Sequence, residues 1–427
     1  MSDDLKQNTS DQVAQVLFSN NLTYTLPSAS SIATNRVMKR NYFQNRTYQN
    51  DTTMICQLNT GTDFIDPINS TLNLKVKVVG AEPSKKYSAS FGTGSVQNLI
   101  KNIRIYHRSG TTYTNTIKQN LFSAKRDRYT KSQNWFDTIG APFMGYNAQS
   151  VFSYDPDGME PPTNIVNFAI PLTLLHGFFN PLGDPLIPAV MASGLRIEID
   201  LESVNGTFQS PTSTLFTTIG SYTIEDCYFN LMSTSLMDSA TAAVNSNAAK
   251  NSLEYLYLDL FTSTNSQSAN STTVNIDVNK SVALLNEAVT VVQLQSTINQ
   301  QRQDQFATAF YSGKFWYQLG SQQFPNQQND NDLLAYHQAL ITFDKMKNED
   351  LPIFVGTELF KESFGIYANS FERNSALSLS QVPVNASRAL RFELTYDEAP
   401  VVATIVTVYL EYVVSSRSTL LNSRIDI

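Results

Sequence analysis

Two stretches of the chain carry the same pattern and decide the predicted fold. They are LIPAVMASGLRIEIDL at Leu186–Leu201 and QVPVNASRALRFELTY at Gln381–Tyr396. Each has a proline, a short spacer and then a run of alternating apolar and polar residues. The runs match at an offset of 195 residues, from Arg196 to Arg391. Such alternation is typical of a β-strand that buries one face. The repeat therefore predicts two similar β domains in tandem.

A further strand follows each copy of the repeat. Thr223-Ile224 and Tyr228 after the first copy correspond to Thr404-Ile405 and Tyr409 after the second, at an offset of 181 residues because the second connecting loop is shorter. Two amphipathic strands can resemble each other by chance, but the shared order of proline turn, strand, loop and final strand favours a true repeat. Each domain is thus predicted to end in a strand pair.

The rest of the chain reads as short strands joined by polar connections. Alternating or β-branched runs predict strands at 72–78, 102–105, 222–231, 253–261, 274–278, 289–294 and 401–414. Short helices are expected at 171–179, 332–346 and 359–369, and the Ala-, Ser- and Asn-rich stretch 238–251 has linker composition. The repeat is too long for an immunoglobulin-like domain of about 100 residues. It fits an eight-stranded jelly roll with inserted loops.

The composition indicates a globular protein with a weakly charged surface. Only 16% of the 427 residues are charged and the net charge is −7, whereas about a quarter is usual. A protein that coats nucleic acid needs a basic surface or arm, and here Asp3, Asp4 and Asp11 stand against Lys6 in the first residues. Direct, sequence-specific binding of nucleic acid is therefore not expected. A polar surface poor in charge suits broad protein–protein contact.

The cysteines and the termini point to a reducing compartment. Cys56 and Cys227 make neither a disulfide framework nor a cysteine-based metal site. The N-terminus has no positively charged segment followed by an apolar stretch, so no signal peptide is expected. The apolar run at 401–414 is interrupted by polar residues such as Glu411 and is too short to span a bilayer.

Motifs for catalysis or metal binding are absent from the sequence. His107, His176 and His337 have no partner at zinc-ligand spacing and are expected to be structural or surface residues. Gly92-Thr93-Gly94 lacks the third glycine of a dinucleotide-binding loop, and there is no GxSxG or GxxxxGK[ST] motif. We therefore predict no catalytic, cofactor-binding or metal-ligating residues, no cofactor and no enzyme activity.

Three charged clusters are weaker candidates. Asp155-Pro156-Asp157-Gly158-Met159-Glu160 could hold Ca²⁺, but the twelfth position of such a loop is Val166, and an ordinary turn is favoured. Lys125-Arg126-Asp127-Arg128 could contact phosphate, although intersubunit ion pairs or a solvated loop are favoured. Glu225-Asp226 lies on a predicted strand with no second carboxylate placed opposite, so a glycosidase pair is not supported.

Taken together, the chain resembles the double jelly-roll major capsid proteins of icosahedral DNA viruses, and it is most similar to those of virophages and polinton-like viruses. The resemblance covers about residues 35 to 416 and is carried by Asn98–Arg104, Phe168–Leu172, Gly177–Phe179, Pro185–Pro188, Phe315–Gly320, Phe324-Pro325 and Leu390–Glu393. The order and spacing of these segments are more specific than any one of them. The chain departs from many relatives after Phe324-Pro325, where Asn326-Gln327-Gln328 stands in place of a second proline.

The resemblance implies an all-β fold of two tandem eight-stranded jelly rolls, with short helices in loop insertions. The expected divisions are an N-terminal arm at 1–34, a first jelly roll at 35–240, a linker at 241–251, a second jelly roll at 252–416 and a C-terminal tail at 417–427. Insertions are expected between the fourth and fifth strands, at 110–162 and 298–352, and between the sixth and seventh, at 171–184 and 356–380.

The resemblance also implies a function and partners. The chain would be a structural capsid protein that forms a pseudo-hexameric homotrimer and meets neighbouring capsomers, penton and minor capsid proteins and, in a virus with an internal membrane, proteins of that membrane. Its place would be the virion, after assembly in a cytoplasmic factory or the nucleus. The alternative is a viral spike or fibre that binds carbohydrate on a β-sandwich, with Trp135 or Trp316 stacking on sugars.

Overall fold

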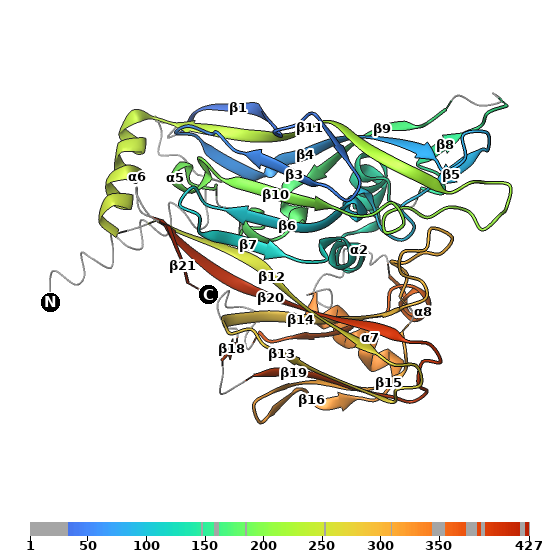
Figure 1. Cartoon of the computed structure of the whole chain (residues 1–427). Coiled ribbons are helices and arrows are strands. Elements are labelled where there is room, and N and C mark those ends of the chain that lie inside the picture. The colour runs from blue at the N-terminus through green and yellow to red at the C-terminus, as the bar shows by residue number, and fades with distance from the viewer. Residues whose placement is uncertain are drawn as a thin grey trace.

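The chain folds into two β-sandwiches that lie one above the other, as the repeat predicts (Figure 1). The computed structural model describes residues 33–426 apart from 147, 158–161, 184–185, 252, 309, 344–354, 373–381, 386–388 and 419–422. Four main sheets are stacked from top to bottom of Figure 1, and we number them I to IV. The predicted N-terminal arm lies outside the described residues except for its last two positions, which begin the first strand.

The first sandwich consists of sheets I and II. Sheet I has the order β1 (Ala33–Tyr42), β11 (Ile219–Leu236), β4 (Phe64–Gly80), β9 (Ile165–Pro171), and β2 (Thr47–Gln49) also pairs with β11. Sheet II has the order β3 (Thr53–Gln57), β10 (Arg196–Leu201), β6 (Ile100–Tyr106), β7 (Thr112–Thr116). Numbering its eight long strands along the chain gives the orders 1-8-3-6 and 2-7-4-5, which is a jelly roll.

The second sandwich repeats that topology. Sheet III has the order β12 (Leu253–Gln267), β20 (Thr404–Ser418), β14 (Val282–Leu294), β17 (Tyr367–Ser370), with β18 (Val382–Val384) on β14 and β21 (Ser423–Asp426) on β20. Sheet IV has the order β13 (Thr273–Val278), β19 (Leu390–Tyr396), β15 (Gly313–Leu319), β16 (Gln322–Asn329). The orders are again 1-8-3-6 and 2-7-4-5. The two repeated stretches of sequence end in β10 and β19, which are the seventh strands of the two jelly rolls.

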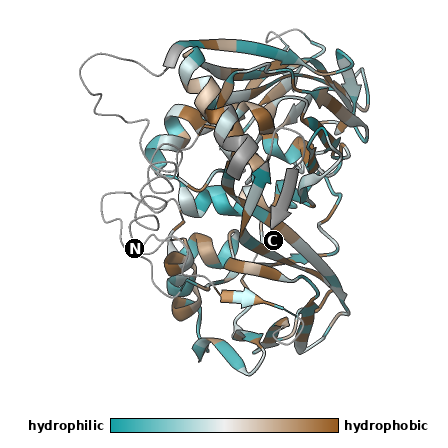
Figure 2. Cartoon of the chain, turned by 90° about the vertical axis from the view of Figure 1, so that its left-hand side faces the viewer, coloured by the Kyte–Doolittle hydropathy of each residue, from teal (hydrophilic) through white to brown (hydrophobic). Residues whose placement is uncertain are grey.

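Alternating burial builds the core of each sandwich. In β10, Ile197, Ile199 and Leu201 are buried while Arg196 is exposed, and each such apolar side chain contributes about 1.5–3 kcal/mol when it is fully buried. Figure 2 shows the same alternation of hydrophilic and hydrophobic residues along the long strands. The buried apolar residues form one cluster that runs through both sandwiches. The two jelly rolls therefore share a continuous core.

Helices and short strands fill the connections. They are β5 (Tyr87–Ala89), η1 (Val96–Leu99), α2 (Gln119–Thr130), α3 (Gln133–Trp135), η2 (Phe136–Gly140), α4 (Ala141–Met144), β8 (Phe152–Tyr154), η3 (Leu172–Leu175), η4 (Gly177–Phe179), α5 (Ala189–Ala192), α6 (Asp238–Asn251), α7 (Asp332–Thr342) and α8 (Thr357–Glu362). Within the described ranges, none of these helices is long and apolar enough to cross a membrane.

Some local predictions differ from the structure. The stretch with linker composition forms α6, because alanine and polar residues also suit a helix that has a fixed start and end. The helix predicted at 359–369 ends at Glu362, and Tyr367–Ser370 is a strand instead. The helix predicted at 171–179 is a pair of short 3₁₀ turns, η3 and η4.

The predicted position of the largest insertions, between the fourth and fifth strands, is wrong. The fourth and fifth strands are joined by short turns, β6 to β7 and β15 to β16, and the insertions lie between the fifth and sixth strands. The error arose at Thr112–Thr116, a polar strand whose sequence TYTNT shows little apolar alternation. The insertion predicted at 171–184 does lie between the sixth and seventh strands, whereas α8 in the predicted 356–380 segment precedes the sixth strand, and 373–380 lies outside the described residues.

Candidate functional site at the joint between the sandwiches

Helix α2 leaves the first sandwich after its fifth strand and lies against the second (Figure 1). It begins after Lys118, which has a left-handed backbone with φ of 53° and whose N–H donates to Asn102 Oδ1 at 3.2 Å. Ten of its twelve residues are buried, including Lys125, Asp127 and Arg128 of the charged run, and Arg126 is partly buried. The prediction of intersubunit ion pairs or a solvated loop for this run is therefore wrong. Runs of charge usually lie at the surface, and this one is satisfied inside the chain.

Lys125 ties the helix to two loops of the second sandwich. Its ammonium group donates to the carbonyl oxygens of Phe306 and, at 2.9 Å, Ser363. Burial lowers the pKa of Lys125 to about 7, while the nearby Asp304 carboxylate acts in the opposite direction. The neighbouring Tyr129 hydroxyl donates to the Phe364 carbonyl oxygen at 2.7 Å. One face of α2 is thus bonded to the backbone of the second jelly roll.

Arg126 reaches a buried pair of carboxyl groups on sheet III. Glu287 of β14 and Glu411 of β20 are cross-strand neighbours, and both are at most 5% exposed. Arg126 Nη2 lies 3.2 Å from Glu411 Oε1, and Asn286 Nδ2 donates to Glu411 Oε2 at 3.3 Å. Burial, and then the negative charge of Glu411, raise the pKa of Glu287 well above its ordinary value. The raised pKa favours the neutral form of Glu287, and the guanidinium group of Arg126 faces the carboxyl group of Glu411.

Asp127 and Arg128 bond back into the first sandwich. Asp127 Oδ2 accepts from the Tyr146 hydroxyl at 2.6 Å and from Gln97 Nε2 at 2.9 Å, and burial raises the pKa of Asp127. Arg128 donates to the Thr93 carbonyl oxygen at 2.9 Å, and its guanidinium carbon lies 4.8 Å from the centre of the Phe136 ring. The first two residues of the run thus bond to the second sandwich, and the last two bond to the first.

A loop of the second sandwich also contacts the first sandwich. Between β14 and β15, Asp304 accepts from the Thr93 N–H at 2.6 Å, which places the Gly92-Thr93-Gly94 segment at the joint and not in a phosphate loop. Arg302 donates to the carbonyl oxygens of Pro211, Ser213 and Phe216 in the first sandwich, the last at 2.8 Å. Gln301 Nε2 donates to Asn205 Oδ1 at 2.9 Å.

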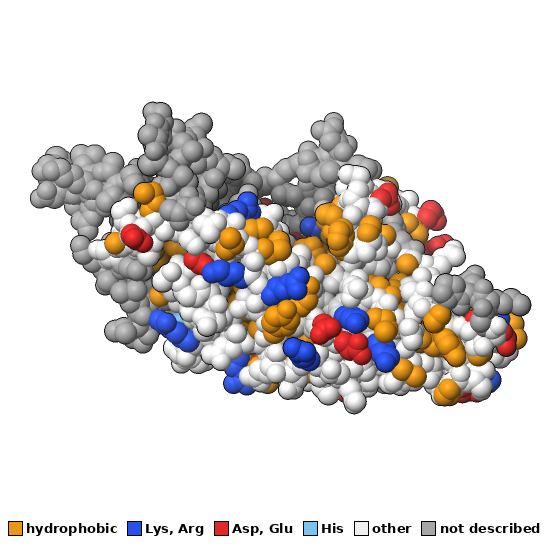
Figure 3. Space-filling view, turned by 90° about the horizontal axis from the view of Figure 1, so that it is seen from above, with side chains coloured by type: hydrophobic (Ala, Val, Ile, Leu, Met, Phe, Trp, Pro, Cys, Tyr) orange, Lys and Arg blue, Asp and Glu red, His pale blue; other side chains and the backbone are white. Residues whose placement is uncertain are grey.

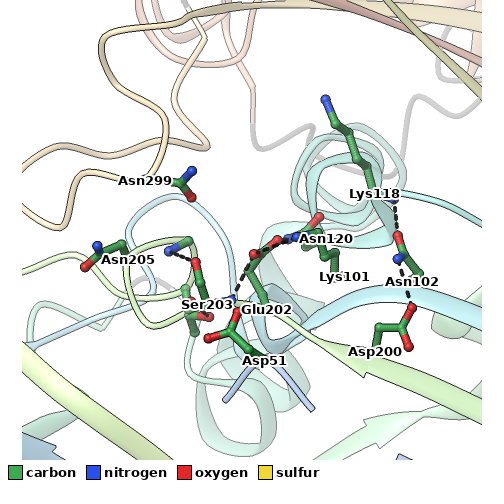
Figure 4. Close-up of polar contacts among 12 residues, drawn as sticks. Asp51, Lys101, Asn102, Lys118, Asn120, Asp200, Glu202, Ser203, Asn205 and Asn299 are labelled. Carbon is green, nitrogen blue, oxygen red and sulfur yellow. Dashed lines mark hydrogen bonds and ion pairs between the residues drawn. The ribbon is translucent and has the colours of Figure 1, made fainter. Parts of the chain in front are cut away.

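Polar contacts continue along the lower side of the first sandwich, where Lys118, Asn120 and the end of β10 meet (Figure 4). Asn102 Nδ2 donates to Asp200 at 3.0 Å, and Asn120 Nδ2 donates to Glu202 Oε2 at 3.2 Å. Lys101 pairs with Glu202 at 3.4 Å. Asp200 and Glu202 are thus both used to hold a strand end or the start of α2.

Aromatic side chains close the remaining part of the joint. The rings of Tyr113 and Phe178 stack with centres 4.5 Å apart, and Phe178 also contacts Tyr255 and Tyr257 of β12. The hydroxyl of Tyr257 donates to the Tyr113 carbonyl oxygen at 2.6 Å. Main-chain bonds between β12 and the segment after η4 add to this contact. The joint combines apolar burial with hydrogen bonds to charged groups, each of which contributes about 1.5–3 kcal/mol.

The other candidate site residues of the sequence do not lie close to one another. His107 is buried near Tyr113, His176 is buried against Phe122, and His337 is exposed on α7. Burial lowers the pKa of His176 well below its ordinary value, so its imidazole is neutral. Asp155 and Asp157 lie on an exposed turn whose following residues are outside the described part, and Glu225 pairs with Lys75 at 3.8 Å. In the described ranges no three His, Cys, Asp or Glu side chains are grouped so as to hold a metal ion.

One residue of the sequence does indicate the joint. A carboxylate inside an otherwise apolar strand must be paired when it is buried, and Glu411 interrupts the run VTVYLEYVV in this way. Its partner Arg126 is 285 residues away in the sequence. The sequence pattern around Glu411 could therefore indicate that a cation must pair with it, but not which residue supplies that cation.

The sequence matches no protein-family model and no curated protein sequence. Solved structures match over almost the whole chain. The PBCV-1 virus capsid model aligns with a TM-score of 0.63 at 11% identity, covering 95% of this chain and 100% of that one. The Faustovirus major capsid protein aligns with a TM-score of 0.60 at 9% identity, over 97% and 98% of the two chains. The mavirus major capsid protein gives 0.51 at 10% identity, over 96% and 94%. The chain therefore has the fold of these viral capsid proteins, with two jelly rolls in tandem.

Proposed function

We propose that this chain is a major capsid protein, a structural and non-catalytic subunit of the icosahedral shell of a double-stranded DNA virus. The observation that carries the proposal is the same eight-strand order found twice, 1-8-3-6 with 2-7-4-5, in two sandwiches locked by a buried joint. The likeness to solved viral capsid proteins over nearly the full chain supports it. Among the described residues, the buried polar groups discussed above serve packing and offer no site for substrate chemistry.

The proposed assembly is a homotrimer. Three chains of two sandwiches supply six similar units, which close into a pseudo-hexagonal ring through heterologous contacts. A rigid joint is needed for such a tile, since each pair of sandwiches must keep a fixed angle while contacts form on both sides. An obligate interface of this kind buries about 2,000 Å² or more.

The proposed partners follow from a place in the virion. Trimers would meet neighbouring capsomers at their edges, and penton and minor capsid proteins at the vertices and the inner surface. The N-terminal arm at 1–34 and the tail at 417–427 are proposed to contact minor capsid proteins or, where the virus has an internal membrane, its proteins. Assembly would take place in the infected cell, in a cytoplasmic factory or the nucleus.

The carbohydrate-binding alternative is not favoured. Trp135 packs edge-on against Phe136, with ring centres 5.2 Å apart, and Lys131 lies over its ring. Trp316 is half-buried in β15 and its indole N–H is buried. Both indoles are thus partly buried, which does not favour a role as open platforms for sugars.

The native mass of the purified protein tests the proposal. A trimer has a mass of about 143 kDa, three times 47.6 kDa. Native mass spectrometry is expected to give that mass independently of dilution, and electron microscopy of the same sample should show a pseudo-hexagonal outline. A monomer at every concentration would contradict the proposal, and binding on a glycan array would then favour a spike or fibre.

A further inference from the structure

The outward face of sheet I is apolar and basic, and nothing in the described part of the chain covers it. Met38 is 54% exposed and Tyr42 is 57% exposed, and Val79 and Ile165 on the same face are also exposed. Figure 3, seen from above, shows these apolar patches among lysine and arginine side chains. An exposed apolar patch with a polar rim is typical of a protein–protein contact.

The same face of the second sandwich is covered. Sheet III is the 1-8-3-6 sheet of that jelly roll, as sheet I is of the first. Its outward residues contact α2: the Tyr409 hydroxyl donates to the Lys118 carbonyl oxygen at 3.1 Å, and the Tyr409 and Phe122 ring centres are 5.0 Å apart. Thus the insertion after the fifth strand of one sandwich caps the 1-8-3-6 sheet of the next.

The sequence repeat places Tyr228 where Tyr409 stands. No helix in the described part of the chain lies over Tyr228 of sheet I. Its ring contacts Tyr42, with centres 5.5 Å apart, and lies 4.9 Å from the guanidinium carbon of Arg40. A hollow of about 400 Å³ opens here, lined by these residues and by Lys75 and Asp226. Asp226 has a φ of 47° at a bulge in β11, so two neighbouring side chains of that strand project to the same face.

Helix α7 is the counterpart of α2 in the second sandwich. Each helix is separated from its fifth strand by two residues: α2 begins at Gln119 after Thr116, and α7 begins at Asp332 after Asn329. Whereas α2 is buried, α7 exposes an apolar stripe: Leu333 is 65% exposed, and Leu334 and Ile341 are also exposed. Leu359 of the adjacent α8 extends the stripe. We call this the α7–α8 surface.

The charges of the two surfaces are complementary. On sheet I, Arg40 and Lys77 make no ion pair within the described residues. The α7–α8 surface carries exposed Asp330, Glu358 and Glu362, while Lys361 is already paired with Asp332 at 3.3 Å. Complementary potentials of this kind fix the orientation and choice of partner.

We propose that the outward face of sheet I, centred on Tyr42 and Tyr228, binds the α7–α8 surface of a second copy of this chain. This contact repeats between copies the packing that α2 makes within one copy. It is heterologous, so each copy offers sheet I to one neighbour and α7–α8 to the other. The inference rests on the proposed homotrimer and specifies which faces form it.

Cross-linking between two tagged versions of the full chain tests the contact. One version carries Tyr42→Cys and the other Leu333→Cys, and both are co-expressed and treated with a short bismaleimide. The native Cys56 and Cys227 are buried and serve as an internal background. The control pairs Leu333→Cys with Val401→Cys, which is on neither surface and is 79% exposed.

The expected result is a product joining the two tags, at least fivefold above the control pair. A product joining Tyr42→Cys to itself, or one no greater than the control, would overturn the inference while a 143 kDa species would still uphold the trimer. A wild-type protein that is only monomeric would contradict the proposed function itself. As a second measurement, Leu334→Asp is expected to weaken the trimer more than tenfold, and Val401→Asp less than twofold.

Discussion

Sheets I and III occupy the same place in the two jelly rolls and share a tyrosine at matching positions, yet their outward faces differ. On sheet III that face buries Glu287, Glu411 and Tyr409 under α2. On sheet I it leaves Glu225, Lys75 and Tyr228 only partly buried. The repeat thus preserves strand order and inward residues, while the outward residues have adapted to what covers them.

The largest expected effect comes from removing the cation of the covered sheet. Arg126→Met leaves the ionised carboxylate of Glu411 buried without its partner, and loss of one member of a buried ion pair costs about 3–5 kcal/mol. Lys75→Met removes the matching cation of sheet I, where an exposed pair contributes about 0–1 kcal/mol. Denaturant unfolding of both variants measures the difference. Equal losses would show that the two faces are energetically alike.

The pH dependence sharpens the same comparison. Because the pKa of Glu287 is raised in the folded protein, its contribution to stability is fully present below its unfolded pKa and is lost as the pH rises through the folded pKa. For one proton the slope approaches about 1.4 kcal/mol per pH unit. We expect Glu287→Gln to gain in stability over the wild type as the pH rises from 5 to 9.

Two other groups at or near the joint also titrate in this range, so the difference between variant and wild type is the quantity to measure. Burial raises the pKa of Asp259 to about 6, and its ionisation also lowers stability as the pH rises. Lys125, with its pKa lowered to about 7, acts oppositely, because the unfolded chain binds its proton more tightly between that value and its ordinary pKa. A difference that stays flat with pH would mean that Glu287 does not hold a proton in the native state.

The smallest effect is expected from the matched tyrosines. Tyr409→Phe removes the buried hydrogen bond to the Lys118 carbonyl oxygen and should cost about 0.5–1.5 kcal/mol. Tyr228→Phe removes a hydroxyl for which the described part of the chain shows no hydrogen bond, so unfolding should be unchanged. Thermal unfolding of the two variants side by side makes the test. A larger loss for Tyr228→Phe would reverse the assignment of covered and open faces.

The sequence predicted the strands well where burial alternates. In β10, β13 and β19 every second residue is apolar, and the structure confirms these three strands. It failed at β7, a polar edge strand with the sequence TYTNT, which contacts β12 and η4 at the joint. It also failed at α6, whose alanine-rich composition is shared by linkers and helices.

The joint lay beyond the reach of sequence patterns. Local periodicity reports which face of an element is buried, but it does not report which distant element buries it. Lys125-Arg126-Asp127-Arg128 therefore read as solvated, because the residues that accept its hydrogen bonds and charges lie in loops and strands far along the chain. In the same way, the sequence pattern could not show that apolar side chains of α7 are exposed. The fold shows it, because no other element among the described residues packs over them.

The distance in sequence between α2 and β20 has a consequence for synthesis. Chains emerge from the ribosome N-terminal end first, and domains tend to fold as they emerge. Here Arg126 precedes Glu411 by 285 residues, so α2 leaves the ribosome before the carboxylate that Arg126 will bind. The Arg126–Glu411 contact of the joint can form only when the last long strand is added. A chain stopped short of that strand retains a helix whose Arg126 lacks its carboxylate, which distinguishes it from the full-length chain.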